Sequence, residues 1–395
     1  RVLTPSLEGN FGGKMRARPK PQNQIREVII GLCALAVLNV SFSPAETWVA
    51  PLWSISTEDE QAPMWGYIAD LKWDAAGNLL VVDSKYSTIT EISKSGEVLS
   101  FSEIAGEGPG EVSHPAGIVT FQGCQRLIRS LPAQLVSRCE GQQEHGAVLR
   151  LAPMDREEGD QAIPIMTGIQ QAGGRLFASW RLFSFSQHAT TYSISEISAE
   201  GRELVRYCSL GAGVGEEAKE DDIPPFAQNQ LWAAGDHQVF CVPDRNAYRI
   251  SVYNLDGPLS HEIQEDRTPA LRSEREMRRA QFVPGTGVTS QSVSKYRPAI
   301  LSIHVVGDML LVSESQEDRE EHALVFRRYA RSGAPMDDLL LEFPEEVSED
   351  RDRIYFVDEN RVVVIYGAGD SLKYGFEESE GSESRPLRLV LYASE

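Results

Sequence analysis

The feature that most constrains the fold of this chain is a strand–turn–strand unit that recurs from residue 48 onward. In each copy, two short apolar stretches flank a tight turn rich in Gly, Asp or Asn, the residues that hairpin turns favour. A second turn, such as Lys94-Ser95-Gly96 or Leu255-Asp256-Gly257, follows within most copies. The copies lie at residues 71–83, 118–128, 169–180, 231–242, 300–312 and 354–365.

The spacing of these copies predicts the architecture. Four-stranded units at periods of about 40–50 residues are typical of propellers, and the longer periods here fit the same pattern with longer loops. Radial packing buries the two apolar faces that a single sheet leaves in water. We predict an all-β fold over residues 46–395, a six-bladed β-propeller with four-stranded antiparallel blades. Residues 48–55 are expected to pair near residues 387–392 and close the ring; a pair of β-sandwiches is the alternative.

Residues 1–45 differ in kind from the rest and form a separate N-terminal extension. A basic segment precedes the thirteen-residue apolar run from Val28 to Val40, and the small residues Ser43 and Ala45 follow it. This order is typical of a signal peptide, so we predict a periplasmic or secreted protein. The run is shorter than the roughly 20 residues of a membrane span, and no span is expected after cleavage. A buried helix and an uncleaved anchor remain alternatives.

Four cysteines follow the predicted signal peptide, and an even number in an exported chain permits disulfides. Cys124 and Cys139 flank two short apolar stretches that are expected to form a hairpin. Directly opposed residues of a hairpin have Cβ atoms about 4.5–5.5 Å apart, close enough to bridge after a small adjustment. We therefore predict a Cys124–Cys139 disulfide. For Cys208 and Cys241, a second disulfide and two buried thiols both remain open.

One stretch carries a resemblance to a known family. Residues 74–83 (DAAGNLLVVD) are followed by Ser95-Gly96-Glu97, by residues 106–111 (GEGPGE) and by residues 114–118 (HPAGI). This pattern resembles the NHL-like six-bladed propellers of exported bacterial proteins over about residues 67–118, and more loosely over residues 248–267. Val112 stands where the family usually has Phe. The resemblance implies a scaffold and not a reaction, because propellers host enzymes and binding surfaces alike.

The charge of the chain limits its partners. Its formal net charge is −20, whereas nucleic-acid binding and docking on anionic lipid both require basic surfaces. The acidic runs fall where loops are expected, and we interpret them as solvated. Calcium or a cationic partner is the alternative. We expect a monomer whose partner is a protein, peptide or glycan outside the cytoplasm.

The candidate site comes from the loops that lead into the innermost strands, because these loops surround one mouth of a propeller channel. They are rich in aromatic residues and Arg, which are enriched at recognition surfaces. The alternative is that the apolar members only plug the channel and that His114 is a structural residue beside Pro115. The predicted ligand-binding residues are Trp65, Tyr67, His114, Phe226, Tyr296 and Arg297.

No catalytic centre can be assigned from the sequence. The seven histidines are scattered without a pair at metal-ligand spacing, and no Gly-x-Ser-x-Gly elbow is present. We predict no catalytic residue, metal ligand or cofactor, with calcium as the open exception. The sequence thus favours an exported binding module, and the alternative is a calcium- or zinc-dependent hydrolase or lyase, such as a lactonase, on the same fold.

Overall fold

The protein was analysed as a computed structural model, in which residues 44–395 form one compact unit. Residues 1–44 of the predicted N-terminal extension lie outside the residues that the structure describes, and Ala45 is the first residue of a strand. Among the described residues, no helix has the length and apolar character needed to cross a membrane. The described residues are 45–59, 62–74, 76–139, 148–150, 163–184, 189–213, 231–244, 246–267, 270–274, 277, 294–315, 322–347, 352–368 and 386–394.

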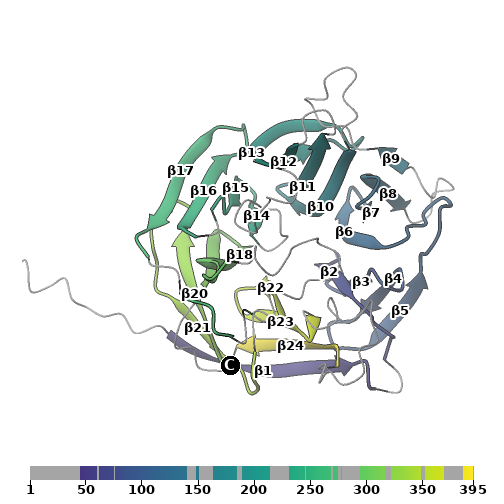
Figure 1. The fold of residues 1–395 in the computed structure, drawn as a ribbon. Helices are drawn as coiled ribbons and strands as arrows, with labels where there is room; N and C mark the ends of the chain where they lie inside the picture. Colours follow the sequence, from purple (N-terminus) through teal and green to yellow (C-terminus); the bar gives the residue numbers. More distant parts are fainter. Residues whose placement is uncertain are drawn as a thin grey trace, which may run out of the picture. The chain divides into compact units, whose positions relative to one another are not determined.

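The first three blades are four-stranded antiparallel sheets in which sequence order equals spatial order (Figure 1). Blade one contains β2 (Ile68–Trp73), β3 (Leu79–Asp83), β4 (Thr88–Ile92) and β5 (Val98–Glu103). Blade two contains β6 (Pro115–Phe121), β7 (Cys124–Arg129), β8 (Gln134–Cys139) and β9 (Val148–Arg150). Blade three contains β10 (Ile163–Ala172), β11 (Arg175–Ser184), β12 (Ala189–Ile197) and β13 (Glu203–Gly213).

The last three blades complete a ring around a central axis (Figure 1). Blade four contains β14 (Trp232–Ala234), β15 (Gln238–Cys241), β16 (Tyr248–Asn254) and β17 (Leu259–Glu265). Blade five contains β18 (Ile300–Val306), β19 (Met309–Glu314), β20 (Ala323–Ala330) and β21 (Leu339–Glu342). Blade six contains β22 (Arg353–Asp358), β23 (Arg361–Tyr366), β24 (Arg388–Ser394) and the N-terminal strand β1 (Ala45–Ser56). The predicted six-bladed propeller is therefore confirmed.

The strand β1 closes the ring. Its second part pairs antiparallel with β24, from Val49 opposite Ser394 to Ser56 opposite Arg388, which confirms the predicted closure. Its first part pairs in parallel with β21 of blade five, with Ala45 opposite Leu339. One strand thus joins blades five and six into a continuous eight-stranded sheet.

The apolar run in β3 illustrates how the blades pack. Leu79 and Val81 lie in the core cluster shared with blade six, whereas Leu80 and Val82 lie in the cluster shared with blade two. Alternate side chains of a strand point to opposite faces, so a strand buried on both faces needs apolar residues at every position. This is why the inner strands appear in the sequence as unbroken apolar runs.

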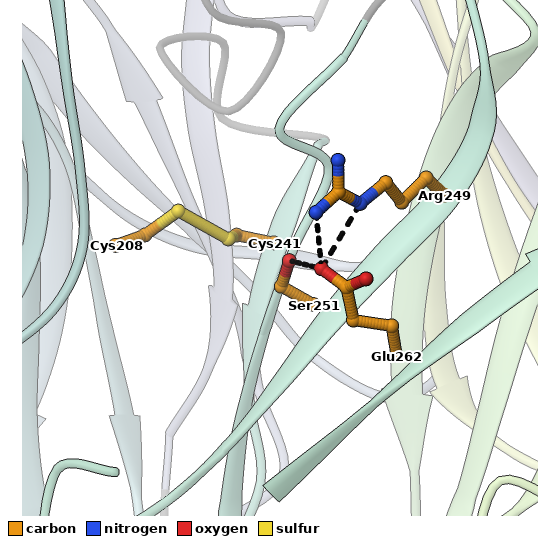
Figure 2. Close-up of a disulfide and its surroundings, with 5 residues drawn as sticks. All are labelled: Cys208, Cys241, Arg249, Ser251 and Glu262. Atoms are coloured by element: carbon orange, nitrogen blue, oxygen red, sulfur yellow. Dashed lines mark hydrogen bonds and ion pairs between the residues drawn. A yellow bond between two sulfur atoms is a disulfide. The ribbon is translucent and has the colours of Figure 1, made fainter. Parts of the chain in front are cut away.

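Two disulfides cross-link the propeller. Cys124 and Cys139 lie directly opposite each other in the β7–β8 hairpin with Cα atoms 4.3 Å apart, so the predicted bond is confirmed. The second joins Cys208 of β13 to Cys241 of β15 and therefore links blades three and four. Figure 2 shows it beside β16, where Ser251, the strand partner of Cys241, donates to Glu262.

Candidate functional site

A cavity of about 200 Å³ lies where the innermost strands face the central channel. Its wall comes from β2, β10, β14, β18 and β22, so five of the six blades contribute. Polar and apolar atoms contribute about equally to its exposed wall. A few polar side chains converge on it, as they do in small-ligand sites of proteins. The polar and aromatic lining residues are Asp70, Lys72, Trp73, Gln170, Trp232, His304, Tyr355 and Phe356.

Asp70 connects the innermost strands of blades one and two. Its Oδ2 accepts a hydrogen bond of 3.1 Å from the N–H of Ile118, and its Oδ1 accepts one of 3.0 Å from the N–H of Leu71. The ammonium of Lys72 lies 3.5 Å from Oδ1. Burial raises the pKa of Asp70, although Lys72 and both N–H groups oppose the rise. A Cβ at Gly117 would lie only 3.0 Å from Oδ2, so a larger residue there would crowd the carboxylate.

Gln170 connects blades three and four in the same way. Its Nε2 donates to the carbonyl of Trp232 over 3.1 Å, and its Oε1 accepts from the N–H of Ala234 over 2.9 Å. Innermost strands are edge strands, whose unpaired backbone groups need partners. Gln170 supplies such partners to β14, as Asp70 does to β6, so both side chains primarily hold the channel wall together.

Arg353 lies at the end of the channel where the innermost strands begin. Its Nη1 donates to the carbonyl of Ile68 over 3.1 Å, and its Nη2 donates to the hydroxyl of Tyr67 over 2.8 Å. The guanidinium also stacks over the Tyr67 ring at 5.2 Å. Burial raises the pKa of Tyr355 to about 12, and the adjacent Arg353 charge offsets part of that rise. Two tyrosines and a guanidinium thus form the channel entrance, which we define as Tyr67, Arg353 and Tyr355.

The loop that carries Tyr67 is fixed by Asp83, the last residue of β3. Its Oδ2 accepts from the N–H groups of Gly66 and Tyr67 over 2.6 and 2.8 Å, and its Oδ1 accepts from Tyr86 over 2.6 Å. Burial raises the pKa of Asp83 against the effect of these donors. The carboxylate satisfies three backbone donors at once, which explains physically why an Asp ends the apolar run here.

His114 belongs to the same loop network. Its Nδ1 lies 3.0 Å from the carbonyl oxygen of Ser84, whose own N–H donates to the carbonyl of Tyr67. Because a carbonyl only accepts, Nδ1 carries the proton of this bond. The N–H of His114 donates to Oγ of Ser87 over 2.9 Å. The structure therefore links two predicted site residues, Tyr67 and His114, through Ser84.

The other predicted site residues lie apart from this network. Trp65 is only 5% exposed, packs in the core between blades six and one, and donates through Nε1 to Thr90. The backbone of Tyr296 and Arg297 pairs with residues 270–272. Phe226 lies outside the described residues. None of the five described residues lines the cavity itself, and a role of the six predicted residues in binding stays a prediction.

His304 is a cavity residue that the sequence analysis did not single out. Its ring centroid lies 5.1 Å from that of Phe356 and 6.2 Å from that of Phe326, and its Nε2 lies 3.0 Å from Oγ of Ser302. Burial lowers the pKa of His304 from 6.5 to about 4. The imidazole is therefore neutral at pH 7 and adds no charge to the cavity.

This burial predicts a pH-dependent stability. An unfolded His binds its proton near pH 6.5, but folded His304 does so only near pH 4. The lowered pKa of His304 therefore contributes fully to the free energy of unfolding above pH 6.5, and this contribution is lost as the pH falls from 6.5 to about 4. Between pH 7 and pH 4, we expect the free energy of unfolding of the wild type to fall by about 3 kcal/mol more than that of His304→Gln. Urea unfolding of both proteins checks this, and parallel pH profiles would contradict it.

The described residues offer no cluster of acidic, histidine or cysteine side chains for a metal. Among the described residues, no three His, Cys, Asp or Glu side chains group in a way that could hold a metal ion. His304 and Asp70 line the cavity, but their polar atoms are engaged by Ser302 and by backbone N–H groups. The calcium- or zinc-dependent alternative thus has no candidate ligand set in the described part of the chain.

Comparisons with known proteins concern the fold. No family model matches the sequence, and no curated protein matches it. Solved structures that match include a gluconolactonase from Xanthomonas campestris (11% identity, TM-score 0.45, covering 88% of this chain and 89% of that chain). Virginiamycin B lyase from Staphylococcus aureus matches at 9% identity and TM-score 0.41 (87% and 99%). Regucalcin, a calcium-binding protein from Agrobacterium tumefaciens, matches at 11% identity and TM-score 0.41 (89% and 96%). The sheet topology defines the class of this protein, a six-bladed β-propeller.

Proposed function

We propose that this protein is an exported binding propeller that recognises a protein, peptide or glycan at its channel entrance. The observation that carries the proposal is the convergence of Tyr67, Arg353 and Tyr355 where β2 and β22 begin, next to a cavity of about 200 Å³. The ligand contacts the entrance and places one group inside the cavity. Propellers host many functions, so the proposal rests on this site and not on the fold.

The residue types at the entrance support recognition. Tyr and Arg combine a large apolar body with polar atoms, and they dominate the binding energy of many interfaces. They are also fixed before a ligand arrives, because Arg353 bonds to Tyr67 and Ile68, and Asp83 fixes the loop that carries Tyr67. Such preorganisation reduces the entropy that is lost on binding.

Export is supported by the cysteines. Both cysteine pairs of the propeller form disulfides, and one of them joins separate blades. Structural disulfides persist mainly in oxidising compartments, which agrees with the signal-like apolar run at residues 28–40.

The test is a binding screen with a matched pair of variants. Oligosaccharides and short peptides are titrated into the wild type, Tyr355→Ala and Phe101→Ala, with dissociation constants measured by calorimetry. Phe101 is 52% exposed on the outer strand β5 and lies outside the cavity wall, so its removal controls for losing an aromatic side chain. We expect Tyr355→Ala to weaken binding about tenfold or more, as truncation of a central aromatic residue typically does.

Circular dichroism verifies that both variants remain folded. Equal affinities in Tyr355→Ala and the wild type would place the binding surface elsewhere and reject the proposed function. A loss of affinity in Phe101→Ala that equals the loss in Tyr355→Ala would also reject it, since the effect would not be specific to the channel.

A further inference from the structure

Arg353 lacks the carboxylate partner that several other half-buried arginines of this protein have. Its polar partners are the carbonyl of Ile68 and the hydroxyls of Tyr67 and Tyr355, and no Asp or Glu of the described chain forms an ion pair with it. By contrast, ion pairs of 2.6 to 2.9 Å join Arg206 to Glu203, Arg361 to Asp358 and Arg175 to Glu196.

This difference is notable because carboxylates are abundant. Asp and Glu outnumber Lys and Arg by 58 to 38 in the whole chain. A desolvated guanidinium is stabilised most by an anion, and leaving it without one is costly. Elsewhere in the propeller an acidic residue meets the guanidinium, as Glu203 meets Arg206 and Asp358 meets Arg361, whereas no carboxylate of the described chain meets Arg353.

The geometry of Arg353 leaves donors for such a ligand. A guanidinium has five N–H donors in one plane, and Ile68, Tyr67 and Tyr355 use three of them. The two that remain are the number that paired N–H bonds to a carboxylate need. The Tyr67 hydroxyl, which accepts from Arg353, still has its own proton to donate to the same anion.

The charges of the neighbouring cavity do not oppose an anion. Asp70 and Lys72 are the charged residues on its described wall, and they lie 3.5 Å apart as a pair. Both oxygens of Asp70 accept from backbone N–H groups of the wall, so this carboxylate is already engaged. Within the part of the chain that the structure describes, no carboxylate pairs with Arg353, so its positive charge at the entrance has no ion-pair partner there.

We propose that Arg353 binds a carboxylate of the ligand at the channel entrance. The inference rests on the proposed function and deepens it by naming the anionic group. Two sources carry this chemistry: the carboxyl terminus or an acidic side chain of a peptide, and the uronic acid of a glycan. In both, the carboxylate lies in the plane of the guanidinium, and the rest of the ligand contacts Tyr67 and Tyr355.

The experiment compares each acid with a neutral counterpart at equal ionic strength. The probes are an acetylated tetra-alanine peptide with a free or an amidated carboxyl terminus, and trigalacturonate with its methyl ester. The proteins are the wild type, Arg353→Gln, Arg353→Lys and Arg331→Gln, whose replaced side chain is exposed in a turn. We expect the wild type to bind at least one acid about tenfold or more tightly than its neutral counterpart, because hydrogen bonds between charged groups are strong.

Arg353→Gln is expected to remove this preference, Arg353→Lys to keep part of it and Arg331→Gln to keep all of it. The preferred acid identifies the peptide or the glycan as the source. Equal binding of acid and neutral probes by the wild type overturns the inference, as does no binding of either acid at millimolar concentration. If neutral probes bind as well as acids and Tyr355→Ala weakens both, the inference fails while the proposed function stands. If Arg353→Gln does not fold, Arg353→Lys provides the test, because an acid preference equal to that of the wild type in this variant would overturn the assignment to Arg353.

Discussion

Removal of residues 45–56 is expected to abolish the closed propeller. The deleted strand β1 supplies the fourth strand of blade six and pairs with both β24 and β21. It also buries Val49, Trp53 and Ile55 in two core clusters. Burial of such side chains contributes about 1.5–3 kcal/mol each, so the three together approach the roughly 5–15 kcal/mol of a whole domain. Circular dichroism and gel filtration of the truncated protein measure the effect.

A pair of point variants controls for the truncation. Trp53→Ala removes one core side chain and the Nε1 hydrogen bond to Lys94, and we expect it to cost about 3–5 kcal/mol. Leu52→Ala changes a neighbouring residue that is 56% exposed, and its effect should stay within about 0.5 kcal/mol. A truncated protein with the urea midpoint of the wild type would contradict the role of β1 in closure.

The loss of the Cys208–Cys241 disulfide is the second large effect. Its cysteines are 33 residues apart. A cross-link of that span lowers the conformational entropy of the unfolded chain, which raises the free energy of unfolding by about 3–4 kcal/mol in the chain-entropy description. Cys208→Ala with Cys241→Ala should lower the free energy of unfolding by this amount, as measured by urea denaturation under oxidising conditions. The bond also joins neighbouring blades, so their common core is expected to lose protection from hydrogen exchange.

Cys124→Ala with Cys139→Ala serves as the comparison. That disulfide closes only 15 residues within one hairpin, so its removal should cost about 3 kcal/mol without a specific effect on the interface of blades three and four. An unchanged urea midpoint in the Cys208–Cys241 variant would mean that this pair does not cross-link the blades in solution.

The fold was largely predictable from the sequence because its physical basis is repetitive. Each inner strand is buried on both faces, so runs such as residues 79–82 stand out as apolar segments between turns. The pairing of residues 48–55 with residues 387–392 followed from the need to cover an unpaired strand at each end of the repeat. The Cys124–Cys139 bond followed from their opposed positions in a short hairpin.

The candidate site was predictable only in part. Tyr67 and His114 were expected at the channel mouth and lie in one hydrogen-bonded network, but Arg353, Tyr355 and His304 were not selected. One reason is that innermost strands contain register shifts, for example between Ile68 and Asp70 in β2. A bulge redirects the side chains beyond it, so simple alternation along the sequence does not identify which residues face the channel.

The most direct test of the channel as the binding site is the indole region of the NMR spectrum, recorded while the binding probe is titrated. Trp73 and Trp232 line the cavity, whereas Trp53 lies on the outer strand β1. The account predicts that binding shifts the signals of Trp73 and Trp232 and that the Trp53 signal stays in place. It also predicts that the shifts are lost in Tyr355→Ala but not in Phe101→Ala. Shifts confined to Trp53, or identical shifts in both variants, would contradict it.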